Sequence, residues 1–279
     1  LHMRHNAFEL LVPMVIRAIS GGTGAGDWFD AVSPYGYAGP ISSGELGDED
    51  VRTGRAAVAE LASAHRIVSA FLRLHPVIES FGRLADLLGP VVEQGEVVVG
   101  DLTRPIEEIE RGFRSVLRNN IRQLEREGFI AERNDFGQWG GFVDAYLATM
   151  RRIDSELYYL FSATYFADLK SLRGRGLDLV TVKAPNGSLA AGAVFLNAGA
   201  GMSYHLSGTA ELYLEAAPTK LVLREAIRLG VERGAHWLNL GGGVGSVRDG
   251  LFAFKARFFH GTRKFCTLRS VFLPDRYVE

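Results

Sequence analysis

The segment from residue 237 to residue 255 constrains the fold of this chain more than any other part of the sequence. An apolar run, 237–240, leads into four glycines within five positions, and Asp249 then precedes an aromatic run that contains Lys255. This order predicts a strand, a tight turn and an Asp-capped helix. Glycines let a backbone approach a ligand closely, and a lysine one turn into the helix reaches a phosphate or a developing oxyanion. The pattern predicts a site for a large anionic substrate built from Phe254, Lys255, Gly241, Gly242 and Gly243.

Length and composition are those of an ordinary globular protein. The chain has 279 residues, of which 47% are hydrophobic and 23% are charged, which allows one large domain or two of roughly 140 residues each. The formal net charge of −1 means that nucleic-acid binding would have to rest on locally segregated charge. The single cysteine, Cys266, excludes an internal disulfide and favours a reducing, cytoplasmic location.

No apolar run near the start of the sequence has the length of a membrane-spanning helix. The apolar run at 10–19 contains a proline and an arginine and is far shorter than the ~20 residues of a membrane helix. We therefore expect no membrane span. The chain opens directly in a predicted strand, so we also expect further residues upstream.

The order of predicted elements indicates an α/β protein with two similar halves. The first half contains a β-rich stretch at 8–19, a glycine-rich connection at 20–26, a helix at 50–65 and strands at 67–74 and 96–100. A helical run then extends from Pro105 to Gly128. The second half contains a helix at 139–153, three strands with an Asn-Gly turn at 186–187, a helix at 218–234 and a last strand at 264–273. This is the order of an acyltransferase-type α/β domain, and the first half looks like an abbreviated copy. We expect domains at 1–128 and 129–279, with mixed sheets.

Arginines recur every four residues in the predicted helix before Gly128. Together with Arg111 there are five arginines between residues 111 and 126, against one acidic residue, Glu125. Residues four apart share one helix face. One interpretation is a phosphate-facing edge that binds tRNA; the other is a solvated face balanced by nearby glutamates, and the pattern favours neither. The residues of this candidate tRNA contact are Arg114, Arg118, Arg122 and Arg126.

The C-terminal stretch interleaves cations with aromatic residues. Bases at a single-stranded RNA end stack on such rings, at about 1–3 kcal/mol per base. Burial in a core is the favoured interpretation for most of these phenylalanines, and Phe254 beside the glycine turn is the exception. Among the cations, Arg257 and Lys264 join the candidate tRNA contact.

Two further segments are candidates for substrate binding. Residues 33–40 form a Pro- and Gly-braced loop whose Tyr35 and Tyr37 could wall a polar ligand, and an ordinary braced loop is the alternative. Tyr204 and His205 lie in a predicted central strand, where His205 either titrates usefully or packs in the core. The seven histidines show no metal-ligand spacing, so no metal is expected. The sequence has no Gly-x-Ser-x-Gly nucleophile motif, and position 246 is a serine where a dinucleotide fingerprint needs glycine.

Four of these segments in this order resemble the FemABX group of the GNAT superfamily, whose members transfer an amino acid from charged tRNA to an amine. The segments are residues 33–40, the Arg-Asn-Asn-Ile-Arg run at 118–122 with Gly128, the Tyr-His-Leu-Ser-Gly run at 204–208, and the Leu-Gly-Gly-Gly run at 240–243 with Phe254-Lys255. The resemblance covers nearly the whole chain. It implies two tandem GNAT-like subdomains and places the family's catalytic Phe-Lys pair at Phe254 and Lys255. The lysine of this pair contacts the tRNA acceptor end and stabilises the charge that develops at the attacked ester. The resemblance also places Tyr35 and Tyr37 near the acceptor pocket.

The resemblance also implies aminoacyl-tRNA as co-substrate, no bound cofactor, and an amine of a small molecule, peptide or peptidoglycan precursor as acceptor. Unlike some peptidoglycan-bridge enzymes, this chain has no long charged heptad segment, which leaves the acceptor open. The alternative is an acetyl-CoA-dependent N-acetyltransferase. Its pyrophosphate loop would precede Pro218, where the chain instead carries one glycine and two acids, Glu211 and Glu215. Carboxylates repel a pyrophosphate, which disfavours acyl-CoA.

Overall fold

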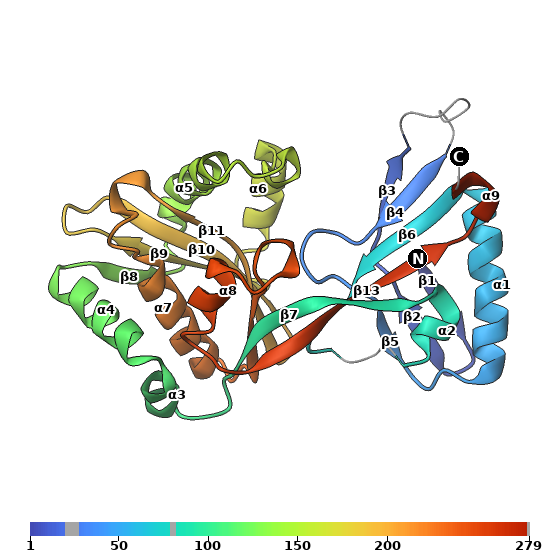
Figure 1. The fold of residues 1–279 in the computed structure, drawn as a ribbon, viewed down its shortest axis with the longest axis horizontal. Coiled ribbons are helices and arrows are strands. Elements are labelled where there is room, and N and C mark those ends of the chain that lie inside the picture. The colour runs from blue at the N-terminus through green and yellow to red at the C-terminus, as the bar shows by residue number, and fades with distance from the viewer. Residues whose placement is uncertain (20–27, 79–81, 278–279) are drawn as a thin grey trace. The chain divides into compact units, whose positions relative to one another are not determined.

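The computed structural model describes residues 1–19, 28–78 and 82–277 (Figure 1). The chain divides into two compact units: unit 1 comprises residues 1–97 and 263–279, and unit 2 comprises residues 98–262. The boundary expected after residue 128 therefore falls within unit 2, because the arginine-bearing helix α4 (Ser115–Arg126) packs on α7 (Thr219–Glu232) of the same unit. The glycine-rich connection at 20–26 lies outside the described residues.

Unit 1 combines strands of two sheets with three helices among its described residues. A three-stranded antiparallel sheet has the order β1-β2-β5, and four strands of a second sheet follow the order β3-β4-β6-β13. The β-rich stretch at 8–19 is divided between these two sheets, with Pro13 between its two strands. Apolar residues of β2, β6 and α2 form a core with Val58 of α1. The bounds are β1 (His2–His5), β2 (Phe8–Leu11), β3 (Val15–Ala18), β4 (Phe29–Val32), β5 (Ile41–Ser43), α1 (Asp48–Ala64), β6 (Ile67–Arg73), α2 (Leu84–Leu88), β13 (Thr262–Val271) and α9 (Pro274–Tyr277).

Unit 2 is built on a mixed sheet with the order β7-β12-β11-β10-β9-β8, in which only β11 and β12 run parallel to each other. The β9–β10 turn at Asn186-Gly187 confirms the predicted hairpin, and Gly187 there has a φ of +82°. The strands are β7 (Val91–Asp101), β8 (Ile130–Arg133), β9 (Leu177–Lys183), β10 (Leu189–Ala198), β11 (Gly201–Thr209) and β12 (Trp237–Gly241). Of β7, the residues from Val98 onward belong to unit 2.

Helices cover both faces of this sheet (Figure 1). The helices α5 (Trp139–Arg152) and α6 (Ala163–Ser171) lie on one face, and α3 (Ile106–Gly112), α4, α7 and α8 (Gly250–Lys255) lie on the other. The second face holds the main core, in which α7 buries Leu221, Val222 and Ile227 against the strands. The mixed sheet with helices on both faces confirms the expected α/β class.

The helical run predicted from Pro105 to Gly128 is two helices. Phe113 and Arg114 adopt extended backbone conformations between α3 and α4, with ψ angles of 145° and 141°. Phe113 is buried against Phe258, with ring centroids 5.3 Å apart, so the interruption places an aromatic anchor in the core. Arg114 consequently precedes the helix that carries Arg118, Arg122 and Arg126.

The adjacent strands β11 and β12 of unit 2 each have an irregular pairing, at nearby positions along the sheet. In the register of β11 with β10, His205 has no Cα partner, and in the register of β12 with β7, Leu240 has none. Such extra residues are β-bulges, which re-aim side chains and end strand pairing, often next to active sites. The parallel pairing of β11 with β12 is formed at Gly201, Met202 and Ser203. Within the described residues it does not continue to Tyr204, so the two strands separate there.

Candidate active site

Lys255 is buried beside the point where β11 and β12 separate. It ends the short helix α8 and is 6% exposed. Its Nζ donates a hydrogen bond to the carbonyl oxygen of Gly242 at 2.6 Å and lies 5.9 Å from the centroid of the Tyr204 ring. Among the residues that the structure describes, no carboxylate lies within ion-pair distance of this ammonium. The structure therefore brings together Lys255, the glycine turn and Tyr204, all of which the sequence predicted.

The environment of Lys255 makes its charge unusually costly. Burial lowers the pKa of Lys255 to about 8, and the charge of Asp249 opposes part of that shift. An ammonium with a pKa near 8 is still mostly protonated at pH 7. It has three N–H donors, of which Gly242 accepts one. The remaining donors can stabilise an oxyanion in a site from which bulk water is largely excluded.

Local interactions fix the glycine turn that receives Lys255. The backbone N–H of Gly241, at a φ of +75°, donates to Asn239 Oδ1 at 2.9 Å. Asp249 caps α8 through the N–H of Phe252 at 2.8 Å and also accepts the N–H of Val244 at 3.0 Å. A Cβ at position 243 would lie 2.2 Å from an Asp249 carboxylate oxygen, so only glycine fits there. The fold itself therefore accounts for Gly241 and Gly243, and Gly242 supplies the carbonyl that holds the ammonium.

Tyr204 and His205, predicted together, make their contacts on different sides of β11. Tyr204 packs with the core beneath α7 and donates its hydroxyl hydrogen to Ser207 Oγ. Burial raises the pKa of Tyr204 to about 12, so it stays neutral. His205 Nε2 instead lies 2.7 Å from the hydroxyl of Tyr165 on α6, and burial lowers the pKa of His205 to about 4. His205 is therefore a neutral imidazole at physiological pH.

Phe254 borders the core and is half-buried. Its ring meets the ring of Phe258 edge-on, with centroids 5.7 Å apart. The other C-terminal phenylalanines, Phe252, Phe258, Phe259 and Phe265, are buried, as expected of core residues.

Asn239 is a feature of this site that the sequence reasoning missed. The residue is 1% exposed, and its Oδ1 accepts the Gly241 N–H. Only the oxygen can accept that bond, so the orientation of the amide is fixed, and Nδ2 has no hydrogen-bond partner among the described residues. A buried donor without a partner is costly and is often found where a ligand or water completes the bond. The apolar run 237–240 contained one polar residue, and that was the available signal.

Lys220 was also missed. It lies in the first turn of α7, where its pKa is lowered by burial and by the positive charge of Arg257. The backbone N–H of Arg114 donates to the carbonyl oxygen of Arg257 at 3.1 Å. Lys220 and Arg257 are close enough to repel each other, and Lys220 lies in the first turn of a 14-residue helix, where the helix dipole favours negative charge.

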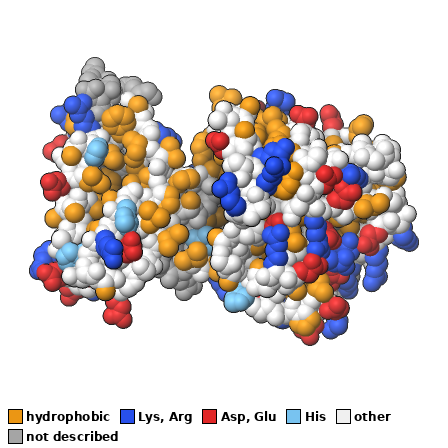
Figure 2. All heavy atoms as spheres, turned by 180° about the vertical axis from the view of Figure 1, so that it is seen from behind, with side chains coloured by type: hydrophobic (Ala, Val, Ile, Leu, Met, Phe, Trp, Pro, Cys, Tyr) orange, Lys and Arg blue, Asp and Glu red, His pale blue; other side chains and the backbone are white. Residues whose placement is uncertain are grey.

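The predicted arginine stripe, which consists of Arg114, Arg118, Arg122 and Arg126, is only partly available to bind RNA. Arg118 uses its Nη1 to donate to the carbonyl oxygens of Arg111 and Phe113, at the end of α3. Arg114, Arg122 and Arg126 are exposed. Glu125 pairs with Arg224 at 2.8 Å rather than with the stripe. Figure 2 shows Lys and Arg side chains gathered with acidic ones along the edge where Figure 1 places α4.

The remaining predicted residues belong to unit 1. Tyr37 packs edge-on against Phe265, with ring centroids 5.3 Å apart, and near His75 at 6.5 Å. Tyr35 is half-buried on the same turn. Lys264 is exposed, and its Nζ lies 2.7 Å from Glu93. Their role in substrate or tRNA binding stays a prediction.

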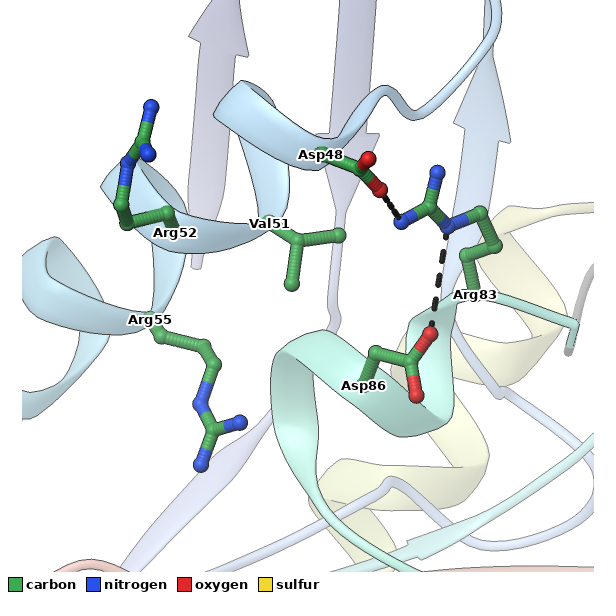
Figure 3. Close-up of a pocket in the computed structure, with 6 residues that line it drawn as sticks. All are labelled: Asp48, Val51, Arg52, Arg55, Arg83 and Asp86. Carbon is green, nitrogen blue, oxygen red and sulfur yellow. Dashed lines mark hydrogen bonds and ion pairs between the residues drawn. The ribbon is translucent and has the colours of Figure 1, made fainter.

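Unit 1 also has a surface pocket of about 520 Å³ between α1 and α2 (Figure 3). Arg83 points between Asp48 and Asp86 and pairs with both. The pocket contains none of the predicted site residues. Across the part of the chain that the structure describes, no group of three or more histidines, cysteines and carboxylates could hold a metal ion, and no helix has the length and apolar character needed to cross a membrane.

The mixed sheet with helices on both faces is the fold of the GNAT acyltransferases, and the family model supports the same class. Residues 111–255 match the family model of the acetyltransferase (GNAT) domain, and the chain belongs to this family. No curated protein matches the chain.

Solved structures show the same fold over nearly the whole chain. The crystal structure of FemX superposes with a TM-score of 0.69 at 13% identity, covering 95% of this chain and 90% of that one. A C-terminal domain assigned to a lysylphosphatidylglycerol synthetase from Agrobacterium fabrum gives 0.59 at 16% identity, covering 94% and 83%. L-PGS from Bacillus licheniformis gives 0.57 at 15% identity, covering 98% and 87%.

Proposed function

We propose that this GNAT-fold acyltransferase transfers an amino acid from aminoacyl-tRNA to an amine and thereby forms an amide bond. The observation that carries the proposal is the buried Lys255 ammonium, held by Gly242 at 2.6 Å next to the separation of β11 and β12. The ordered motifs that resemble the FemABX group support it, as does the shared fold with FemX.

The chemistry requires little from the protein. An aminoacyl ester is already activated, so the enzyme must mainly position an amine and stabilise the tetrahedral intermediate. The amine nitrogen attacks the ester carbonyl carbon, a C–N bond forms, and the carbonyl oxygen becomes an oxyanion opposite the Lys255 ammonium. The C–O bond to the ribose then breaks, the attacking nitrogen loses a proton, and the leaving ribose oxygen takes up a proton to become a hydroxyl group. No covalent nucleophile is needed.

Lys220 and Arg257 support a donor that carries phosphates. Their mutual repulsion at the start of α7 is relieved when an anion binds between them. In the proposal they hold a phosphate near the acceptor end of tRNA, and the exposed Arg122 and Arg126 contact the backbone further away.

The same two cations favour a second candidate, an acyl-CoA-dependent N-acetyltransferase. A pyrophosphate at the start of α7 would use Lys220 and Arg257 in the same way. Glu211 and Glu215 are exposed in the segment before α7, and their negative charges oppose such a donor.

A transfer assay separates the two donors. The protein is incubated with a mixture of amines and total tRNA charged with labelled amino acids, and amide products are detected by mass. We expect products that disappear after RNase treatment. Product that survives RNase contradicts the tRNA donor, and product formed only with acetyl-CoA establishes the second candidate.

A further inference from the structure

Unit 2 has a second pocket at the opposite end of β12 from the glycine turn. The pocket has a volume of about 740 Å³, within the range of about 300–1,000 Å³ typical of small-molecule sites. It lies where β11 and β12 begin, next to the start of β9 and the end of α7. Since β12 spans five residues at about 3.3 Å each, the pocket is separate from the Lys255 site. Its polar lining includes Asn134, Arg173, Asp178, Asn197 and Arg233.

A buried carboxylate organises one wall of this pocket. The Asp178 side chain is 1% exposed and accepts hydrogen bonds from Asn134 Nδ2 at 2.8 Å, from Asn197 Nδ2 at 2.6 Å and from Arg233 Nη1. Both carboxylate oxygens are therefore occupied, and Asp178 is not a ligand for a cation. Its role is to fix the guanidinium of Arg233 from one side.

The anchored guanidinium keeps most of its donors. The Arg233 side chain is 45% exposed although its partner is buried. A guanidinium has five N–H groups, and Asp178 occupies Nη1. A planar fork whose rotamer is set by a buried carboxylate is preorganised for a second oxyanion on its other edge.

A second arginine lines the same pocket, and no ion pair among the described residues neutralises its charge. Arg173 comes from the connection between α6 and β9, and the described residues include no carboxylate paired with it. The charged lining residues are Arg173, Arg233 and Asp178, so the formal charge is two positive minus one negative, or +1. Two guanidinium forks suit a dianion, and a phosphate monoester carries about −1.5 to −2 at pH 7.

The pocket is larger than a phosphate and has an aromatic wall. Phe136 lines it and stacks on Trp139, with ring centroids 5.9 Å apart and an interplanar angle of 26°. A ring supported in this way offers a flat apolar surface to a second ring. The side-chain oxygen of Asn197 remains as an acceptor for a polar ring substituent.

We propose that this pocket binds a nucleoside monophosphate, with the phosphate between Arg173 and Arg233 and the base against Phe136. The ligand is either a free nucleotide or the phosphorylated end of an oligonucleotide. The site is distinct from the acyl-transfer site, and the proposal does not depend on the identity of the acyl donor.

Calorimetric titration of the full chain with AMP tests this site. We expect saturable binding that adenosine does not reproduce and that inorganic phosphate reproduces only weakly. A 5′-phosphorylated oligonucleotide serves as a further arm: binding tighter than that of AMP identifies a nucleic-acid end, and weaker binding identifies a free nucleotide. Adenosine binding as tightly as AMP, or no saturation by AMP at millimolar concentration, would overturn the proposal.

Two neighbouring arginines provide a matched pair of variants. Arg173→Ala should weaken AMP binding at least tenfold, and Arg175→Ala less than twofold, because Arg175 does not line the pocket and donates to the Ser171 carbonyl oxygen at 2.9 Å. Equal weakening by both variants would show non-specific attraction and contradict the site. Arg233→Lys adds a test of the anchored fork, with an intermediate loss expected. Lys255→Ala should leave AMP binding unchanged, so this proposal and the proposed function fail independently.

Discussion

Lys255 and Lys264 lie close together in the sequence, and the structure gives them opposite surroundings. Lys255 is 6% exposed and hydrogen-bonded to a backbone carbonyl, and burial lowers its pKa to about 8. The Lys264 side chain is 73% exposed and pairs with Glu93, whose hydrogen bond raises the pKa of Lys264. The ammonium of an exposed lysine that is already paired with a carboxylate interacts only weakly with a further anion. A buried ammonium without a carboxylate partner interacts with an anion much more strongly. The environment therefore distinguishes a candidate catalytic lysine from a surface lysine.

Replacement of the two lysines by alanine is the most direct way to break this comparison. We expect Lys255→Ala to lower kcat/KM for acyl transfer about 10²–10³-fold, the range for loss of one oxyanion donor. Lys264→Ala should change it less than about twofold, in line with an exposed ion pair. Steady-state kinetics with a saturating donor would measure both. Comparable losses in the two variants would mean that desolvation is not what distinguishes Lys255.

The stability of the fold should respond to the same buried charge. Between the folded pKa of Lys255 of about 8 and its ordinary value of 10.5, the unfolded chain binds a proton that the folded chain does not. The contribution of this group to stability therefore rises with pH across that window, and the full penalty applies below pH 8. At pH 7 we expect the free energy of unfolding of Lys255→Met to exceed that of the wild type by on the order of 3 kcal/mol, seen as a higher midpoint of urea unfolding.

The control for this effect is its pH dependence. Urea unfolding of Lys255→Met and wild type should converge as the pH approaches 10.5, and Lys264→Met should show no such gain at any pH. A Lys255→Met protein that is no more stable than wild type at pH 7 would show that the ammonium is compensated in solution.

The smallest effects are expected on the arginine stripe. Arg122→Ala or Arg126→Ala should weaken tRNA binding a few-fold and reduce the salt dependence by about one phosphate contact, since each removes a single exposed cation. Arg118→Ala should instead lower the melting temperature, because its guanidinium binds carbonyl oxygens of residues 111 and 113. Filter binding at several salt concentrations, with melting curves, separates these outcomes. Equal effects on binding from all three arginines would restore the interpretation of a single tRNA-binding face.

Local patterns predicted much of unit 2. The Asn-Gly turn, the helix predicted at 218–234 and the Asp-capped helix after the glycines all reflect interactions within a few residues. They correspond to the β9–β10 turn, α7 and α8. Lys255 beside its glycine turn was predictable for the same reason.

Features that depend on distant partners were not predictable. The helix break at Phe113 arises because that ring packs against Phe258, and helix periodicity alone continues through the position. The repulsion between Lys220 and Arg257 links the first turn of α7 to the residues after α8, which lie far apart in the sequence. Asn239 became visible only when its burial and its unpartnered Nδ2 were known.

Unit 1 is formed from two separate segments of the chain, residues 1–97 and 263–279, which affects how it folds during synthesis on the ribosome. Its strand β6 pairs with β13, which is translated only after all of unit 2. Unit 2 is continuous and can acquire its structure while the chain is still growing, whereas β6 waits with an uncovered hydrogen-bonding edge. Truncation just before β13 would therefore leave β6 without this partner strand and the earlier-made part of the polypeptide dependent on chaperones.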